Sequence, residues 1–165
     1  MGEMDRRTAD VTGSEVTSDA ELYRQHAPEL VRFAAMLVGD DAEDVVASAF
    51  ARCMSAEGWS EVENHRAYLF RAATNEARTL QRSAASRRLR EQRLAADGVV
   101  EVGVPRPEVW EAVESLSIRQ RAVVYLTYWH DMSDVMVAEL LGIGPGSVRR
   151  HLARARDKLR KVLHD

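Results

Sequence analysis

The sequence predicts an all-α protein of two small helical domains joined by a flexible linker, with a helix-turn-helix in the C-terminal domain. Apolar residues recur at intervals of three and four along most of the 165 residues, which is the helical pattern. No segment alternates apolar and polar residues convincingly, as a half-buried strand would. A stretch rich in glycine, valine and proline interrupts the helical pattern near residue 100.

The domain limits follow from changes in composition. Residues 1–18 are polar and acidic and lack the apolar run of a secretory signal, so we expect a flexible tail there. Residues 95–107 contain two glycines and two prolines and are the expected linker. The first helical domain is therefore expected at 19–94 and the second at 108–165.

The first domain is predicted to contain three helices. They span about residues 20–38, 42–55 and 65–94. Gly39 and the two aspartates after it form the first break, and Pro28 is expected to kink the first helix. The second helix has an apolar face that includes Cys53, which is expected in the core. The third helix is apolar at first and rich in arginine later, so its later half is expected to be exposed.

The second domain is predicted to contain four helices, the last two of which form the helix-turn-helix. They span about residues 108–115, 118–129, 133–141 and 145–163. Ser133 can cap the third helix, Gly142 can adopt the positive φ of a tight turn, and Pro145 fits the first turn of the last helix. The aromatic residues expected in the core of this domain are Trp110, Tyr125 and Trp129.

The last helix has an apolar stripe opposite a basic face. The stripe consists of Val148, Leu152, Ala155, Leu159 and Val162. The basic face consists of Arg149, Arg150, His151, Arg154, Arg156, Lys158 and Arg160. An exposed basic helix after a tight turn suits insertion into the major groove, because arginine can bind guanine edges or phosphates. The competing interpretation is a basic amphipathic helix that binds a protein partner.

Positive charge is concentrated in two blocks of an otherwise acidic chain, whose net charge is −3. Residues 71–93 have seven arginines against two glutamates, and residues 149–165 have seven basic residues against two aspartates. Residues 1–63 and 94–148 have net charges of −9 and −5. Local clustering sets phosphate affinity more than net charge does, so the two blocks favour nucleic-acid binding over a solvated helix face.

Other classes of function lack support in the sequence. It contains no nucleotide-binding loop, nucleophile motif or metal-spaced set of histidines and cysteines, so we expect no enzyme activity, no cofactor and no metal. No run of about 18 apolar residues is present, so no membrane insertion is expected. The single cysteine cannot form an internal disulfide, which fits the reducing cytoplasm.

Several motifs in both halves follow one family pattern. In the second half they are LSIRQRAVV at 116–124, MS at 132–133, AELLGI at 138–143, GSVR at 146–149 and LARAR at 152–156. In the first half they are DAEDVV at 41–46 with Phe50, YLFRAA at 68–73, Asn75 and Arg82. Together they resemble the extracytoplasmic-function (ECF) sigma factors of the sigma-70 family, over roughly residues 19–163. Both halves in this order are far more specific than a helix-turn-helix alone.

The resemblance implies a specificity subunit of RNA polymerase. In such proteins the first domain binds core polymerase and opens the promoter's minus-ten element, and the second reads the minus-thirty-five element as duplex DNA. The implied partners are core RNA polymerase, through its clamp and flap, promoter DNA and an anti-sigma factor.

The resemblance also assigns roles to individual residues. The implied minus-thirty-five contacts are Arg119, Ser147, Arg149, Arg150, His151, Arg154 and Arg156. The implied minus-ten contacts are Trp59, Tyr68, Arg71, Asn75, Arg78 and Arg82. The implied polymerase contacts are Asp41, Glu43, Asp44, Val45, Val46 and Phe50.

The minus-ten roles have a physical basis, because strand opening needs bases to be captured as they leave the stack. Asn75 can hydrogen-bond a base edge, and arginines on the same helix can hold phosphates. Tyr68 is either a stacking surface or a core aromatic. Trp59 either lines a pocket or anchors its loop.

The sequence departs from the family pattern at several positions. Ala47 and Ser48 replace a polar glutamine–glutamate pair, which bears on the strength of clamp binding. The other departures are Tyr68 for tryptophan, Thr79 for an acid, Met136 for a charged residue and Gly144 for a serine-like cap. The loss of that cap is expected to cost about 1 kcal/mol. These changes bear on promoter choice and leave the overall plan intact.

An autonomous helix-turn-helix regulator is the alternative function. It would use the N-terminal helices to dimerise or to sense a signal, and it would bind a palindromic operator tightly. The basic block at 71–93, far from the helix-turn-helix, favours the sigma factor instead. A sigma factor is expected to be a monomer when free and to bind duplex promoter DNA poorly without polymerase.

Overall fold

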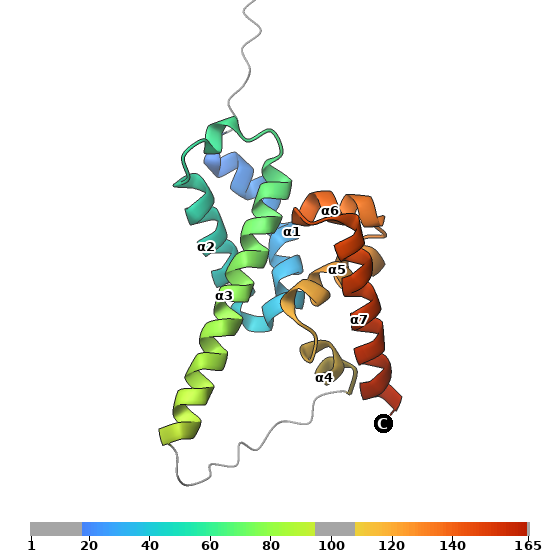
Figure 1. Ribbon diagram of the computed structural model, residues 1–165. Helices are drawn as coiled ribbons and strands as arrows, with labels where there is room; N and C mark the ends of the chain where they lie inside the picture. Colours follow the sequence, from blue (N-terminus) through green and yellow to red (C-terminus); the bar gives the residue numbers. More distant parts are fainter. Residues whose placement is uncertain (1–17, 95–107, 165) are drawn as a thin grey trace, which may run out of the picture.

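The computed structural model describes residues 18–94 and 108–164, and within these ranges all regular structure is helical (Figure 1). The first half contains α1 (Asp19–Val38), α2 (Ala42–Met54) and α3 (His65–Leu94), with 3-10 turns at Gly39–Asp41 and Trp59–Glu61. The second half contains α4 (Glu108–Glu114), α5 (Ile118–Tyr128), α6 (Asp134–Leu141) and α7 (Pro145–His164). The all-α prediction is confirmed. The expected linker and nearly all of the expected N-terminal tail lie outside the described residues.

The ends of the helices follow local sequence signals. Ser18 caps α1, since its Oγ accepts the N–H of Glu21 at 3.3 Å. Pro28 lies within α1 without ending it, and the helix continues to Gly39, whose φ of 66° breaks it. A single helix therefore spans the position of the expected kink.

The helix-turn-helix forms as the sequence predicts. Ser133 Oγ accepts the N–H of Met136 at 3.3 Å and caps α6. Gly142 ends α6 with a φ of 65°, in the left-handed region that favours glycine, and α7 begins at Pro145. Three local signals thus set both helices and the turn between them.

The first half has an aromatic core. Phe33, Phe50 and Phe70 are fully buried, and the rings of Phe33 and Phe70 lie 4.7 Å apart between α1 and α3. Cys53 is buried beside them, as predicted. Burial raises the pKa of its thiol to about 11, so the thiol stays protonated and unreactive near neutral pH.

The apolar stripe of α7 is only partly buried. Val148, Leu152 and Ala155 lie in the core of the second half, where α7 packs against α5 and α6. Val162, at the far end of the predicted stripe, is 41% exposed. The stripe therefore docks the first part of α7, and α4 lies beside the later part of the helix (Figure 1).

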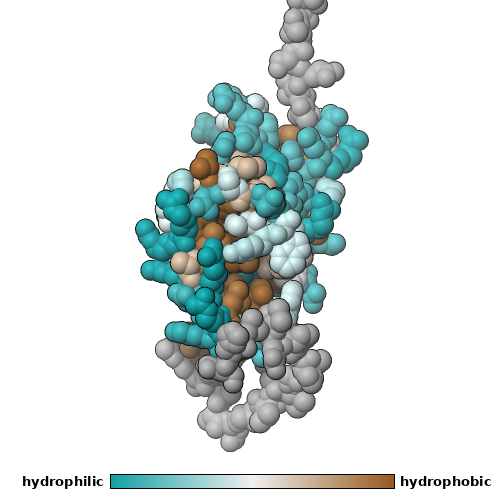
Figure 2. Space-filling view, turned by 90° about the vertical axis from the view of Figure 1, so that its right-hand side faces the viewer, coloured by the Kyte–Doolittle hydropathy of each residue, from teal (hydrophilic) through white to brown (hydrophobic). Residues whose placement is uncertain are grey.

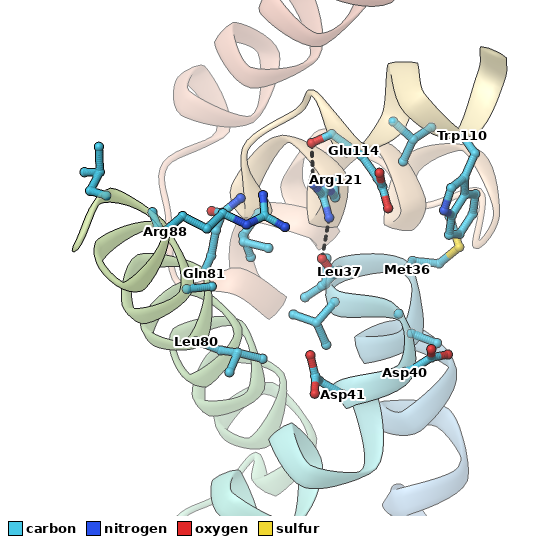
Figure 3. A pocket seen from close by; sticks show the side chains of 18 residues that line it. Met36, Leu37, Asp40, Asp41, Leu80, Gln81, Arg88, Trp110, Glu114 and Arg121 are labelled. Carbon is cyan, nitrogen blue, oxygen red and sulfur yellow. Dashed lines mark hydrogen bonds between the residues drawn. The ribbon is translucent and has the colours of Figure 1, made fainter. Parts of the chain in front are cut away.

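The two halves are packed against each other through one continuous apolar core. α1 contacts α5, and α3 contacts α6, which lies beside the first turns of α3 (Figure 1). The Phe33 and Tyr125 rings are 6.0 Å apart across this seam between the halves. An open pocket of about 1350 Å³ also lies in the seam (Figure 3). The domain prediction did not foresee this contact.

Two of the three aromatic residues expected in the second core are exposed. Tyr125 is 7% exposed, as predicted, but Trp129 is 70% exposed and stacks on Tyr125 from outside. Trp110 is 39% exposed at the seam pocket, where it lies beside Met36 (Figure 3). The prediction was wrong for both tryptophans, because a large apolar side chain is not always buried.

The described residues were searched for a membrane-spanning helix and for a group of metal-binding side chains. Among residues 18–94 and 108–164, no helix is long and apolar enough to cross a membrane. The same ranges contain no group of three metal-binding side chains.

Candidate nucleic-acid interface

The helix-turn-helix presents the basic face of α7 to solvent. Arg149, Arg150, Arg154 and Arg156 are exposed, whereas Ser147 and His151 are half-buried. Figure 2 shows the α7 side of the molecule, where hydrophilic side chains border a strip of apolar ones. The predicted minus-thirty-five residues on α7 are therefore brought together on one accessible helix.

The start of α7 is held by main-chain bonds. The Gly144 carbonyl accepts the N–H groups of Ser147 and Val148 at 2.9 and 3.1 Å. Arg149 reaches back to Asp134 at the start of α6, with an N–O distance of 3.5 Å. Both side chains are partly exposed, so this ion pair contributes little stability and leaves Arg149 able to bind phosphate.

Arg119 on α5 extends the basic face of α7. Burial lowers the pKa of His151, and the neighbouring Arg119 lowers it further. Arg154 and Arg150 act in the same direction. These four residues therefore form one electropositive cluster, in which His151 favours its neutral form until an anion approaches.

A second set of predicted residues meets on α3. Tyr68, Arg71 and Asn75 line a surface pocket of about 430 Å³ between α2 and α3. Asn75 is exposed and Tyr68 is 37% exposed, so both can meet a ligand. Arg52 and Glu76 line the same pocket and form an ion pair with each other. Side chains that can stack, hydrogen-bond and neutralise charge thus surround one opening.

Trp59 is not available at that pocket. Its indole is 7% exposed, and Nε1 donates to Asp19 Oδ1 at 2.8 Å. The ring packs edge-on against His65 at 4.5 Å and lies 5.7 Å from the ring of Tyr68. The structure therefore supports the interpretation of Trp59 as an anchor of its loop. Tyr68, and not Trp59, is the aromatic side chain exposed at the pocket.

The remaining arginines of α3 differ in their surroundings. Arg82 is exposed, while burial, Arg119 and Arg82 all lower the pKa of Arg78. Arg78 of the first half thus lies near Arg119 of the second, and the two predicted DNA-binding sets adjoin each other. Arg71 already has a partner, because its Nη2 donates to the Glu139 carbonyl at 2.7 Å.

The residues predicted to bind polymerase divide into two groups. Asp41, Glu43 and Asp44 are exposed around the start of α2 and form an acidic surface. The buried group consists of Val45, Val46 and Phe50, at most 4% exposed. These three side chains face the core beneath the acidic surface. Because they are buried, they are not accessible to a partner in this structure, which corrects their expected role as polymerase contacts. The family motif combines both kinds of residue, which is why sequence reasoning did not separate them.

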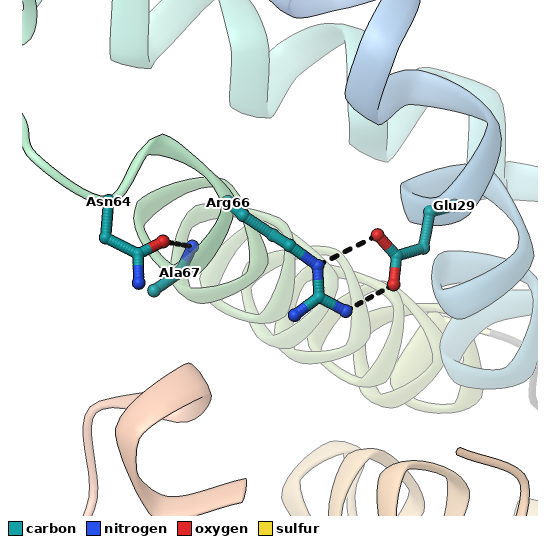
Figure 4. Close-up of polar contacts among 4 residues, drawn as sticks. All are labelled: Glu29, Asn64, Arg66 and Ala67. Atoms are coloured by element: carbon teal, nitrogen blue, oxygen red, sulfur yellow. Dashed lines mark hydrogen bonds and ion pairs between the residues drawn. The ribbon is translucent and has the colours of Figure 1, made fainter. Parts of the chain in front are cut away.

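Sequence reasoning missed the ion pairs that hold α3 in place. Arg66 donates two hydrogen bonds to the Glu29 carboxylate of α1, one of them at 3.0 Å (Figure 4). The Arg66 guanidinium also lies 5.0 Å from the centre of the Phe70 ring. The hydrogen bond from Arg66 lowers the pKa of Glu29. No local signal links two residues 37 positions apart.

Comparisons with known proteins place both halves in one family. The Sigma-70 region 2 model matches residues 22–88, and the Sigma-70 region 4 model matches residues 106–159. The chain is 31% identical over 157 residues to the RNA polymerase sigma-E factor of Streptomyces coelicolor, covering 90% of this chain and 88% of that one. It is 30% identical over 177 residues to the ECF RNA polymerase sigma factor SigL of Mycobacterium tuberculosis, covering 96% of each chain.

Two solved structures have a similar fold. The sigma factor RpoE in complex with the anti-sigma factor NepR, from Bartonella quintana, has a TM-score of 0.62 at 23% identity, covering 88% of this chain and 96% of that one. CnrH in complex with the cytosolic domain of CnrY has a TM-score of 0.56 at 26% identity, covering 88% and 87%. Family models over both halves and relatives over the whole length agree, and the chain belongs to the ECF sigma factors of the sigma-70 family.

Proposed function

We propose that this chain directs core RNA polymerase to a specific set of promoters in the cytoplasm and acts there as a regulatory subunit rather than an enzyme. The observation that carries this proposal is the presence of two basic surfaces, one on α7 and one on α3, together with an exposed acidic surface at the start of α2. A single operator reader needs only the helix-turn-helix surface. Two basic surfaces that can bind DNA, together with an acidic surface that can bind another protein, suit a chain that holds polymerase on a promoter.

The helix-turn-helix surface is proposed to read the minus-thirty-five element as duplex DNA. The exposed Arg150 and Arg154 are the best candidates to reach base edges, because they lie on the solvent side of α7 after the turn. Arg119, Arg149 and Arg156 are proposed to hold phosphates. Ser147 and His151 are half-buried and are proposed to contact the backbone of the DNA.

The pocket on α3 is proposed to receive a base of the minus-ten element after the strands separate. Asn75 can hydrogen-bond the base edge, Tyr68 offers a face for stacking, and Arg71 can neutralise the adjoining phosphate. Arg78 and Arg82 continue the basic surface along α3. This arrangement requires Arg71 to leave its partner on α6.

The acidic surface of Asp41, Glu43 and Asp44 is proposed to bind the clamp of core polymerase, and the second half is proposed to contact the flap. The two solved structures of similar fold are complexes: RpoE is bound to the anti-sigma factor NepR, and CnrH is bound to the cytosolic domain of CnrY. This chain is therefore proposed to be held inactive by an anti-sigma factor.

Run-off transcription with bacterial core RNA polymerase tests the proposal. The chain is expected to produce transcripts with defined starts from a library of genomic fragments, whereas core polymerase alone is not. The double variant Arg150→Ala/Arg154→Ala is expected to lose these transcripts. The variant Arg160→Ala is the matched control, because Arg160 is exposed near the far end of α7 and is paired with Asp157.

The alternative function predicts a different result. An autonomous regulator would bind a palindromic operator tightly as a dimer without polymerase. Such binding by the free chain, together with no promoter-dependent transcript from any fragment, would refute the sigma-factor proposal.

A further inference from the structure

The later half of α3 extends beyond α1 and α2 (Figure 1). From Gln81 to Arg90 only Ala84 is half-buried, and the other side chains are exposed. A helix segment that buries so little apolar surface gains little stability from packing, so the fold does not account for its arginines. These arginines are accessible to a partner.

Two of these arginines lie on the same face of α3 as the minus-ten pocket. Successive residues of an α-helix are rotated by about 100°, so Arg82 lies about 20° and Arg90 about 60° from the direction of Asn75. Tyr68 and Arg71, which line the pocket, lie within about 40° of Asn75 by the same rule. All five side chains are exposed. They form one strip along α3, here called the α3 strip.

The opposite side of α3 faces the seam pocket. Arg88 lies about 140° from the direction of Asn75 and lines that pocket (Figure 3). Arg121 lines the same pocket and donates to the Leu37 carbonyl at 2.6 Å (Figure 3). Arg88 and Arg90 are thus two exposed arginines, two positions apart, that point to different sides of one helix.

The two later arginines of the α3 strip have donors to spare. Arg82 Nε donates to the Arg78 carbonyl, and Arg90 Nε donates to the Ser86 carbonyl, both at 3.3 Å. These bonds direct each side chain along the helix and leave its two Nη groups as donors for another acceptor. Phosphate oxygens are acceptors that suit a guanidinium group. The α3 strip therefore continues from the base pocket as a row of phosphate-binding groups.

We propose that Arg90 binds a backbone phosphate of the duplex upstream of the minus-ten element, with Arg82 between this contact and the base pocket. The inference rests on the proposed function, in which Asn75 meets the captured base. The second half follows α3 in the chain and is proposed to read the upstream element, so the far end of α3 is expected to point upstream.

The length of the α3 strip places the contact on the DNA. The 15 residues from Asn75 to Arg90 span about 22 Å at 1.5 Å per residue. Duplex DNA that lies along the strip covers this length with about six or seven base pairs at 3.4 Å per step. A phosphate contact there carries no sequence information of its own. It would fix the direction in which the duplex leaves the base pocket.

Binding of the full chain with core polymerase to two DNA fragments tests this contact. Both carry the minus-ten element of a promoter identified by run-off transcription, and both lack the minus-thirty-five element. The duplex of the short fragment ends at the upstream edge of the minus-ten element, and that of the long fragment continues for one helical turn, about 10 base pairs.

Arg90→Ala is expected to weaken binding to the long fragment about fivefold near 0.15 M salt, because one phosphate contact is lost. The slope of log affinity against log salt concentration is expected to fall by about one for the same reason. Binding to the short fragment is expected to stay unchanged. Arg88→Ala is the matched control, since it removes the same charge from the opposite side of α3, and it is expected to leave both affinities unchanged. Circular dichroism checks that both variants keep their helices.

Neutral methylphosphonates, placed one at a time along the upstream duplex, locate the phosphate. Binding of the wild-type complex is expected to weaken about fivefold when the substitution lies about six or seven base pairs upstream of the captured base. The Arg90→Ala complex is expected to be insensitive to that substitution. Such a dependence of one change on the other identifies a direct contact, which a general effect of charge would not produce.

Three results would overturn the proposal: equal weakening by Arg90→Ala and Arg88→Ala, equal weakening of both fragments by Arg90→Ala, and unchanged binding of the long fragment by Arg90→Ala. Failure of the wild-type complex to bind even the short fragment would instead count against the proposed function, and the inference would fall with it. The two failures are therefore distinguishable.

Discussion

The basic surfaces of α7 and α3 are similar in charge, but their arginines differ in whether they already have partners within the protein. On α7 the arginines that follow the turn are exposed, and Arg149 is held only by a partly exposed ion pair. On α3 the arginine nearest the pocket already donates to the other half, and Arg78 is crowded by Arg119. Under the proposed function, the α7 surface can meet duplex DNA as it stands, whereas Arg71 on α3 would first have to leave the Glu139 carbonyl.

The largest expected effect is on stability and concerns the apolar core between the two halves that present these surfaces. Phe33→Ala is expected to lower the free energy of unfolding by about 3–5 kcal/mol, because Phe33 is fully buried and contacts aromatic rings of both halves. Urea unfolding followed by circular dichroism measures the change. Tyr23→Ala is the control, since Tyr23 is 45% exposed. An equal loss in the free energy of unfolding for the two variants would show that the contacts of Phe33 across the seam do not stabilise the fold.

The next effect separates the roles of the two surfaces. Arg150→Ala is expected to weaken binding of polymerase to duplex minus-thirty-five DNA roughly 10- to 100-fold, the loss of one base contact of about 1–3 kcal/mol. Asn75→Ala is expected to leave that binding unchanged and to slow strand opening. Duplex binding is measured by fluorescence anisotropy and opening by permanganate footprinting. If both variants fail at the same step, the proposed division of roles is wrong.

A smaller effect tests whether the placement of α3 depends on its ion pair with α1. Glu29→Gln is expected to lower the free energy of unfolding by about 1 kcal/mol, because a charge-assisted pair becomes a neutral one and both side chains are partly exposed. The lowered pKa of Glu29 means that its contribution is present above pH 4.5 and is lost as pH falls through the folded-state pKa. Asp157→Asn, at an exposed pair, is the control and is expected to change nothing.

The smallest effect concerns pH. Burial lowers the pKa values of both His26 and His151 below 6.5, so the unfolded chain takes up protons first as pH falls. The free energy of unfolding is therefore expected to fall below about pH 6.5 and to level off below the folded-state pKa values. DNA phosphates near His151 would favour its protonated form, so duplex binding is expected to strengthen modestly over the same range. His151→Gln should remove the pH dependence of binding, and His26→Gln should not.

The helix-turn-helix could be predicted from the sequence because its signals are local. Ser133, Gly142 and Pro145 act within a few residues of the bonds that they determine. The packing of the halves could not be predicted in this way. The contacts of Arg71 and Arg121 join residues 68 and 84 positions apart, and the residues between them contain no pattern that points to those partners.

The candidate sites show the same limit. The helical period of apolar and basic residues located the exposed α7 face. The family pattern could not separate exposed acids from buried apolar residues on α2, because the motif contains both. The exposure of Trp129 is set by the neighbours that α5 meets, and apolar character alone does not determine it.

Gly142 links two distant parts of the sequence in a way that bears on which variants of this chain can exist. Asparagine tolerates the left-handed conformation and often replaces glycine at a helix end. Here its Cβ would meet the side chain of Arg71. A side chain at position 142 is therefore accommodated only if the Arg71 side chain moves away from the turn. The choice of turn residue and the placement of a side chain 71 residues earlier in the chain are thus linked by one contact.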